Sequence, residues 1–416
     1  MEKKRNFWLT LSLANLSLVA FFGFCLRSKM LFPLPIINYR YMLSAHSHFA
    51  FAGWAGLALM TLLIYDLLPG TVSNKKFYHR ILAGIQVSSL GMAFTFPFMG
   101  YNAVSIFFST LYIVVAVVFA PVFIKDVLVS VKNSTVKLLG ISAVSSLIIS
   151  FLGALGLVYI LIARSNNATL YRDSIYTFLH FQYNGFFTLA VFALLFQHLA
   201  CKNISSGNNG RMFAVFLCAS IIPTLFLSLL WHNNNFFYVL AGVGSLLIII
   251  CLWHFFRFIR SVNIKQVFSS PSARTLWVFA IFSFGFKMLL NVGTIFPVLG
   301  NAVYGNRPVI IGFLHLVFLA FLSFYLLASM LEKNLFRKNR KGIVTSFYLF
   351  SFGIFANEIT LMVQGLGIFF RTNSTIFQWL LWIASIILFL GALWMLLSRL
   401  SANKKAIEQS MASDNL

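Results

Sequence analysis

Five histidines lie near the ends of apolar segments, and their residue type and spacing indicate ligation of a metal ion or a cofactor. Three of them begin a repeated pattern, in which aromatic residues follow the histidine and Gly or Ala stands five residues after it. The three copies are His48-Phe-Ala-Phe-Ala-Gly53, His180-Phe-Gln-Tyr-Asn-Gly185 and His315-Leu-Val-Phe-Leu-Ala320. They are separated by 132 and 135 residues, and the other two histidines are His46 and His232. Ionisable side chains in such segments usually mark a pathway or a cofactor site.

His46 and His48 cannot both ligate one ion from a regular helix. Residues i and i+2 point about 200° apart around a helix axis. We therefore expect the two imidazoles to face different neighbours, or one of them only to line the helix.

The elements that carry these histidines are membrane helices. Of the 416 residues, 60% are hydrophobic and only 9% are charged, which excludes a soluble domain of this length. Apolar runs long enough to cross a hydrocarbon core of roughly 30 Å recur along the whole chain. We predict twelve spans, at 7–26, 43–67, 81–99, 101–124, 138–163, 174–199, 211–232, 235–256, 276–299, 308–331, 343–370 and 376–398.

The histidine pattern divides these spans into three pseudo-repeated four-helix units of an all-α integral membrane protein. The units cover roughly 1–130, 131–260 and 261–402, and a polar tail that we expect to be disordered occupies 403–416. With the N-terminus in the cytoplasm, the predicted inner segments hold 23 of the 31 Lys and Arg residues, as the positive-inside rule requires. Both termini and the tail are then cytoplasmic. The net charge of +23 reflects topology and attraction to anionic lipid, and we expect no nucleic-acid partner.

Twelve helices with histidines near the outer ends of spans 2, 6, 7 and 10 resemble subunit I of the haem-copper oxidases, a superfamily that includes nitric-oxide reductases. The His-x-His followed by Gly also resembles NnrS-type haem and copper membrane proteins. The resemblance implies a haem, of b type and low spin, held by His48 or His46 and by His315. It implies contacts between haem propionates and two arginines, Arg40 and Arg371.

The same resemblance implies a copper ion at His180 and at His232, whose surroundings Trp231-His232-Asn233 are similar to the Trp-x-His-His of the oxidases. This chain departs from the oxidases at Phe313, where they have a second histidine on span 10. It also carries only one histidine on span 7, so full oxygen reduction is in doubt. From the residues themselves, a second centre could form if His46 faces His180 and His232, since three imidazoles suit copper or non-haem iron.

Two charged residues lie at the predicted bilayer depth. Lys287 falls about midway along span 9, and Glu358 about midway along span 11. An isolated charge costs several kcal/mol there unless it is paired or hydrated. We therefore expect either a mutual ion pair or a proton path.

Two functions from different classes follow. The first is a haem-bearing redox protein that transfers electrons or handles O2 or NO, which the resemblance places in the bacterial inner membrane with a cytochrome or quinol donor and partner subunits. The second is a proton-coupled transporter or copper-handling assembly factor without haem, since transporters also contain internal repeats.

Overall fold

The computed structural model describes residues 2–300, 306–336, 341–369 and 374–413, and side chains over 2–300, 306–336, 342–367 and 374–401. The described chain is all-α, and twelve of its helical spans are long and apolar enough to cross a membrane, which confirms the predicted fold class. Nine spans are α1 (Glu2–Leu31), α5 (Lys76–Met99), α6 (Ala103–Ser130), α7 (Ser134–Ile162), α10 (Gly207–Leu225, continued by η4, Phe226–His232), α11 (Asn235–Ser261), α13 (Pro271–Gly293), α17 (Lys341–Phe369) and α18 (Ile376–Ser413). Short helices α4 (Gly70–Ser73) and α12 (Ile264–Val267) connect spans.

The other three spans are interrupted helices, and they carry the repeated histidines. The second span consists of α2 (Tyr39–Phe49), η1 (Ala50–Gly56), α3 (Leu57–Leu62) and η2 (Leu63–Leu67). The sixth consists of α8 (Ala168–His180), η3 (Phe181–Phe187) and α9 (Thr188–Cys201). The tenth consists of α15 (Arg307–His315), η5 (Leu316–Ser323) and α16 (Phe324–Glu332).

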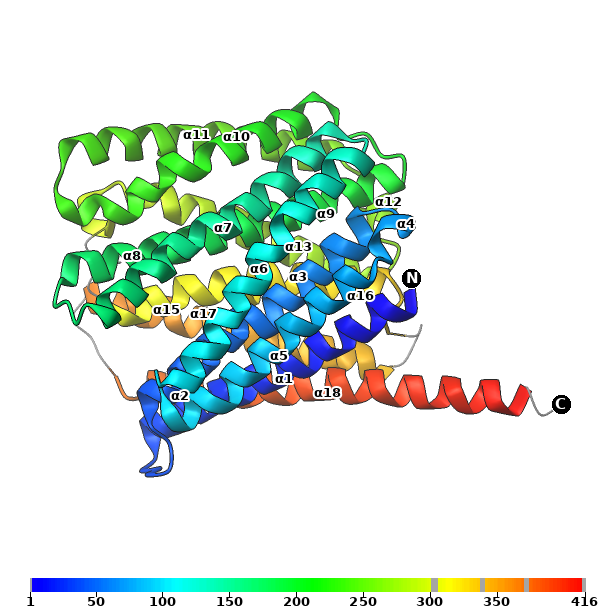
Figure 1. Cartoon of the computed structure of the whole chain (residues 1–416), viewed down its shortest axis with the longest axis horizontal. Coiled ribbons are helices and arrows are strands. Elements are labelled where there is room, and N and C mark those ends of the chain that lie inside the picture. Colours follow the sequence, from blue (N-terminus) through cyan, green and yellow to red (C-terminus); the bar gives the residue numbers. More distant parts are fainter. Residues whose placement is uncertain (1, 301–305, 337–340, 370–373, 414–416) are drawn as a thin grey trace.

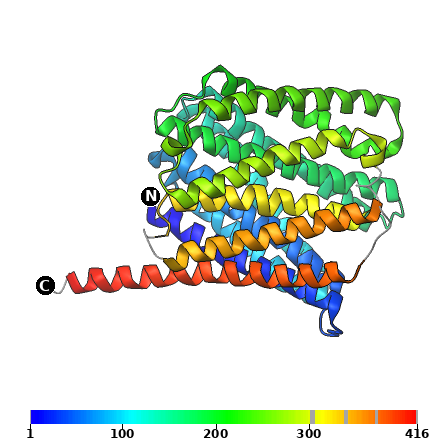
Figure 2. The same ribbon diagram turned by 180° about the vertical axis from the view of Figure 1, so that it is seen from behind.

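The helices run side by side, and α1 begins at the same end of the bundle at which α18 ends (Figure 1). We call this the inner end, following the predicted orientation, and the opposite end the outer end. The green helices of the second unit lie along the top of Figure 1, and the view from behind shows the yellow to red helices of the third unit (Figure 2).

A π-helical segment begins one or two residues after each repeated histidine. η1 starts at Ala50, η3 at Phe181 and η5 at Leu316. A π-helix holds one more residue in each hydrogen-bonded turn than an α-helix, and such segments are frequent at functional sites. The three histidine-bearing spans therefore share a local backbone feature as well as a sequence pattern.

Side chains bond the backbone carbonyls of the π-helical segments. Asn15 Nδ2 of α1 donates to Gly53 O at 2.7 Å in η1. Thr188 Oγ1 donates to Tyr183 O in η3, and Ser323 Oγ donates to Phe318 O at 2.7 Å in η5. Both hydroxyl donors stand eight residues after the histidine of their span and bond the carbonyl five residues before them, which is the π-helical register.

Three phenylalanines bring the interrupted spans together at mid-depth. Phe51, Phe187 and Phe318 each contribute one ring, and their centroids lie 4.3 Å (Phe51 to Phe318), 5.1 Å (Phe187 to Phe318) and 5.8 Å (Phe51 to Phe187) apart. Trp54 Nε1 also donates to Ser323 Oγ at 3.0 Å, which ties the second span to the tenth. The centre of the bundle is thus a packed aromatic contact between the three units.

The interrupted spans are covered unevenly. On the inner side of the phenylalanines, all six residues of α3 are buried, as are ten of the 14 in α9 and seven of the nine in α16. On the outer side, only three of the 11 residues of α2 and two of the 13 in α8 are buried, and none of the nine in α15. The outer halves of the central helices therefore have faces that the described protein does not cover.

Two predicted boundaries are wrong. The ninth span was expected to reach residue 299, but α13 ends at Gly293 and a turn follows, because Pro297 lacks a backbone N–H and restricts the residue before it. The tail at 403–416 was expected to be disordered, yet the backbone of α18 is helical to Ser413. Ala, Lys, Glu, Gln and Met in that segment are good helix formers.

We predict that Asn15→Ala lowers the free energy of unfolding by about 1–3 kcal/mol, because it leaves Gly53 O and the side chain of Gln86 without a buried partner. The measurement is equilibrium unfolding in mixed micelles. Asn74→Ala, which removes an exposed amide between α4 and α5, is the control. Equal stability of the two variants would contradict the role given to Asn15.

Candidate functional site

His46 and His315 face a common region at the outer end. His46 Nδ1 is 3.0 Å from Val19 O of α1, which leaves its Nε2 free of a hydrogen bond in the described structure. His315 Nδ1 is buried and has no hydrogen-bond partner among the described residues. The two imidazoles are close enough to interact electrostatically with each other and with Arg27. Both rings are half-buried, at the incompletely covered outer halves of their spans.

Gly23 of α1 allows this position of His46. A Cβ atom at residue 23 would come within 3.3 Å of His46 Cε1, closer than side-chain atoms normally approach. The helix α1 therefore orients His46 in two ways, through the Val19 carbonyl and through the absence of a side chain at Gly23.

His48 points away from this region, toward α5 and the turn after it. Its Nδ1 is 2.9 Å from Ser44 O, its Nε2 is 3.4 Å from the Tyr101 hydroxyl, and its ring stacks on Phe96 at 4.7 Å. Burial raises the pKa of the Tyr101 phenol, so the hydroxyl stays protonated and can donate to the imidazole. The prediction that His46 and His48 serve different neighbours is confirmed, and it is His46 that shares a region with His315.

The three imidazoles expected at a second centre do not come together. His180 Nε2 is 2.7 Å from Ile221 O and its Nδ1 is 3.2 Å from Asn184 Nδ2, so both ring nitrogens are engaged. His232 Nε2 is 3.0 Å from Asp173 Oδ1. In the part of the chain that the structure describes, no three His, Cys, Asp or Glu side chains form a group that could hold a metal. The expected grouping of His46, His180 and His232 is therefore not formed.

The arginines near His46 and His315 differ from those expected. Arg40 is exposed, and Arg371 lies outside the described residues. Instead, Arg27 lies within electrostatic range of Arg307 and of Tyr39. The Arg307 guanidinium donates to Tyr39 Oη at 3.0 Å and lies over the Tyr39 ring at 5.0 Å. Two cations and a phenol thus meet where the second and tenth spans begin.

The predicted ion pair between Lys287 and Glu358 is not formed in the described structure. Lys287 Nζ donates to Thr188 Oγ1 at 2.7 Å and to Tyr183 O at 3.4 Å. Glu358 accepts a hydrogen bond from Asn357 Nδ2 at 3.0 Å. The lysine bonds the sixth span, so its charge is not balanced by Glu358.

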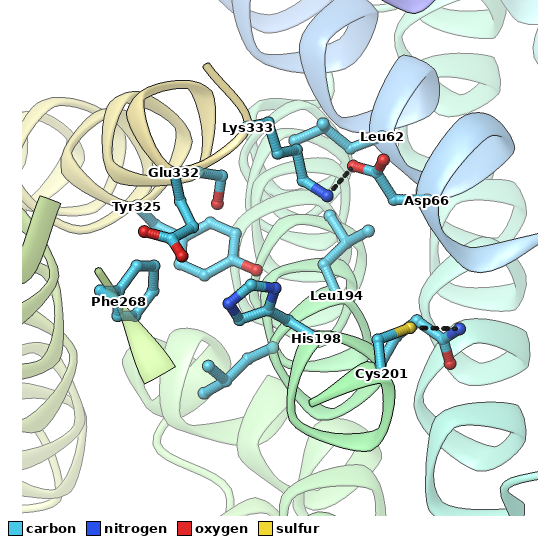
Figure 3. A pocket seen from close by; sticks show the side chains of 12 residues that line it. Leu62, Asp66, Leu194, His198, Cys201, Phe268, Tyr325, Glu332 and Lys333 are labelled. Atoms are coloured by element: carbon cyan, nitrogen blue, oxygen red, sulfur yellow. Dashed lines mark hydrogen bonds and ion pairs between the residues drawn. The ribbon is translucent and has the colours of Figure 1, made fainter. Parts of the chain in front are cut away.

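A cavity of about 70 Å³ lies between the inner ends of the three interrupted spans. Figure 3 shows Lys333 reaching toward Asp66, with His198 and Tyr325 beside the same space. Asp66 pairs with Arg5 at 3.1 Å and with Lys333 at 3.0 Å. These charges balance one another at the mouth of the bundle.

Sequence reasoning missed this inner cluster, although the repeat contains its signal. Asp66, His198 and Lys333 each stand 18 residues after the repeated histidine of their own span. At 1.5 Å per residue, 18 helical residues cover about 27 Å, close to the thickness of the hydrocarbon core. A comparison of the three repeats at equal offsets predicts that these side chains lie at one depth.

No protein-family model matches this chain, and no curated protein sequence matches it.

Replacement of Asp66 by Asn should lower the free energy of unfolding by about 3 kcal/mol, because Arg5 and Lys333 lose their common counter-charge in a poorly solvated place. Equilibrium unfolding in mixed micelles measures the change. The matched control is Lys75→Ala, which breaks the more exposed pair with Asp126 and should cost about 1 kcal/mol or less. A loss in Asp66→Asn no larger than that of the control would show that the inner cluster does not hold the spans together.

Proposed function

We propose that this integral membrane protein binds a haem through His46 and His315 and transfers electrons. The observation that carries the proposal is the outer pair of imidazoles, which come from two central spans, interact electrostatically, and each keep a ring nitrogen without a hydrogen bond in the described structure. A haem with two imidazole ligands needs one such nitrogen from each of two facing helices.

The surroundings of His46 fit a ligand of this kind. Histidines that ligate a metal usually donate their other ring N–H to a carbonyl or carboxylate, which fixes the ring orientation. Val19 O is placed to accept that proton from Nδ1, at 3.0 Å. His180 and His48 fit less well, because their ring nitrogens already have partners on both sides.

The outer cations fit the acidic groups of a haem. Arg27 and Arg307 lie at the beginning of the second and tenth spans, and a planar guanidinium can bond a carboxylate with two parallel N–H groups. They take the role that the sequence gave to Arg40 and Arg371. The uncovered faces of α2 and α15 also leave room for a large apolar group at this end.

A haem with both axial positions filled supplies one-electron redox chemistry and has no open position for a gas. The proposal is therefore narrower than O2 or NO turnover. The chain's own residues would orient the ligands, balance the propionate charge and exclude water through the aromatic contact below. Since His46 and His315 lie at the outer end, an electron donor such as a cytochrome or quinol would approach from that side.

A transporter is the second candidate, because interrupted spans and a charged inner cavity are features of transporters. The rings of Phe51, Phe187 and Phe318 separate that cavity from the outer histidines. This packing favours the redox proposal over a continuous solute path.

We expect His46→Ala and His315→Ala each to remove most of the haem from the purified protein, since each takes away one axial ligand. His48→Ala should retain it, because His48 faces α5. Haem per polypeptide is measured as the pyridine haemochrome, and the melting temperature in detergent reports folding. Haem retained in both ligand variants, or lost only in His48→Ala, would refute the assignment.

A bulky residue at position 23 should act through His46. Gly23→Leu is expected to displace the imidazole and lower the haem content, whereas Gly242→Leu on α11, where a Cβ meets nothing within 4 Å, should leave it unchanged. Equal haem content in the two variants would mean that α1 does not orient His46.

A further inference from the structure

A small polar cavity surrounds the ammonium group of Lys287 inside the second and third units. Its volume is about 10 Å³, and it lies between η3, α9, α10 and α13. Six polar side chains line it: Asn184, Thr188, Ser220, Thr224, Lys287 and Asn291. Cavities within membrane helices are otherwise apolar, so the concentration of polar groups requires an explanation.

The charge of Lys287 has no counter-charge in the described structure. The side chain is 0% exposed, and its two hydrogen bonds go to Thr188 Oγ1 and Tyr183 O, which are both neutral. The rings of Tyr183 and Phe321 lie 5.9 and 5.8 Å away, and the thiol of Cys251 is the titratable group that interacts with it. Among the described residues, no carboxylate forms an ion pair with Lys287. A buried, unpaired ammonium costs several kcal/mol.

Hydrogen-bond donors remain available around the cavity. An ammonium group has three N–H donors and Lys287 uses two of them. Asn291 gives one amide proton to Asn184 Oδ1, and Asn184 gives one to His180 Nδ1, so each amide keeps a second proton. Ser220 and Thr224 donate to backbone carbonyls of α10 and contribute no further donor. The free donors are thus one ammonium and two amide N–H groups.

We propose that this cavity binds a small monovalent anion of halide size, with chloride as the physiological occupant. The anion neutralises Lys287 and accepts the remaining protons of Lys287, Asn184 and Asn291. A cavity of this volume holds about one water-sized particle, which excludes a carboxylate or a phosphate. Water would fill the space but would leave the ammonium without a counter-charge.

The site is independent of the proposed haem. It lies beside His180, whose nitrogens are engaged by Ile221 O and Asn184, and involves neither His46 nor His315. The anion would also fix Lys287 against Tyr183 O, so it would stabilise the π-helical segment of the sixth span.

The test is equilibrium dialysis of the purified full chain in detergent with radioactive chloride, at constant ionic strength set by gluconate. We expect saturable binding of about one chloride per chain, because the cavity has room for about one ion. Bromide should compete and gluconate should not. Absence of saturable binding, or equal competition by gluconate, would overturn the proposal.

Two variants separate anion binding from a purely structural role of the lysine. Lys287→Gln should raise the Kd roughly thirtyfold or more, because it removes the buried charge that the anion pairs with. Asn291→Asp should have the same effect while keeping the fold, since position 291 is one helical turn after Lys287 and the new carboxylate supplies the counter-charge itself.

The control is Lys75→Gln, which removes a half-exposed lysine of the ion pair with Asp126 and should leave the Kd unchanged. The melting temperature in detergent identifies variants that fail to fold, and Asn291→Asp decides the matter if Lys287→Gln is one of them. Chloride binding in Asn291→Asp with the wild-type Kd would show that Lys287 does not hold the anion.

Discussion

Each backbone carbonyl inside a membrane needs a donor from the protein itself, and this constraint governs the three central spans. Their π-helical segments change the backbone register at mid-depth, where lipid offers no hydrogen bond. Asn15, Thr188 with Lys287, and Ser323 supply the donors. The central polar residues of the bundle therefore stand where the interrupted helices require them. Lys287 is the exception in kind, because it brings a full charge to a task that a hydroxyl performs in the tenth span.

The three units keep one helical frame and differ in the chemistry of equivalent positions. All three have a histidine before the π-helical segment. In the second unit the ring of His180 bonds Ile221 O and Asn184, whereas His46 in the first unit and His315 in the third keep a nitrogen free. At the inner end, the positions 18 residues further on carry an acid, an imidazole and an amine. Divergence of one repeated unit thus accounts for an asymmetric bundle with different groups at its two ends.

The twelve spans could be predicted from the sequence because lipid imposes length and apolarity on each helix separately. The partners of individual side chains could not, because they depend on how each helix is rotated. His46 and His48 lie on one helix, and only the packing of α1 and α5 decides that His46 meets His315 while His48 stacks on Phe96. Lys287 and Glu358 share a depth in the sequence, yet Lys287 turns to the sixth span. The inner cluster was within reach of the sequence, since equal offsets from the repeated histidines identify Asp66, His198 and Lys333.

The central claim is that two imidazoles hold one haem at the outer end. The most direct test is the absorption spectrum of the purified wild-type protein in detergent, oxidised and then reduced, with and without carbon monoxide. The account predicts sharp reduced bands of a six-coordinate haem that carbon monoxide does not shift. A featureless spectrum from protein expressed with ample haem would contradict it.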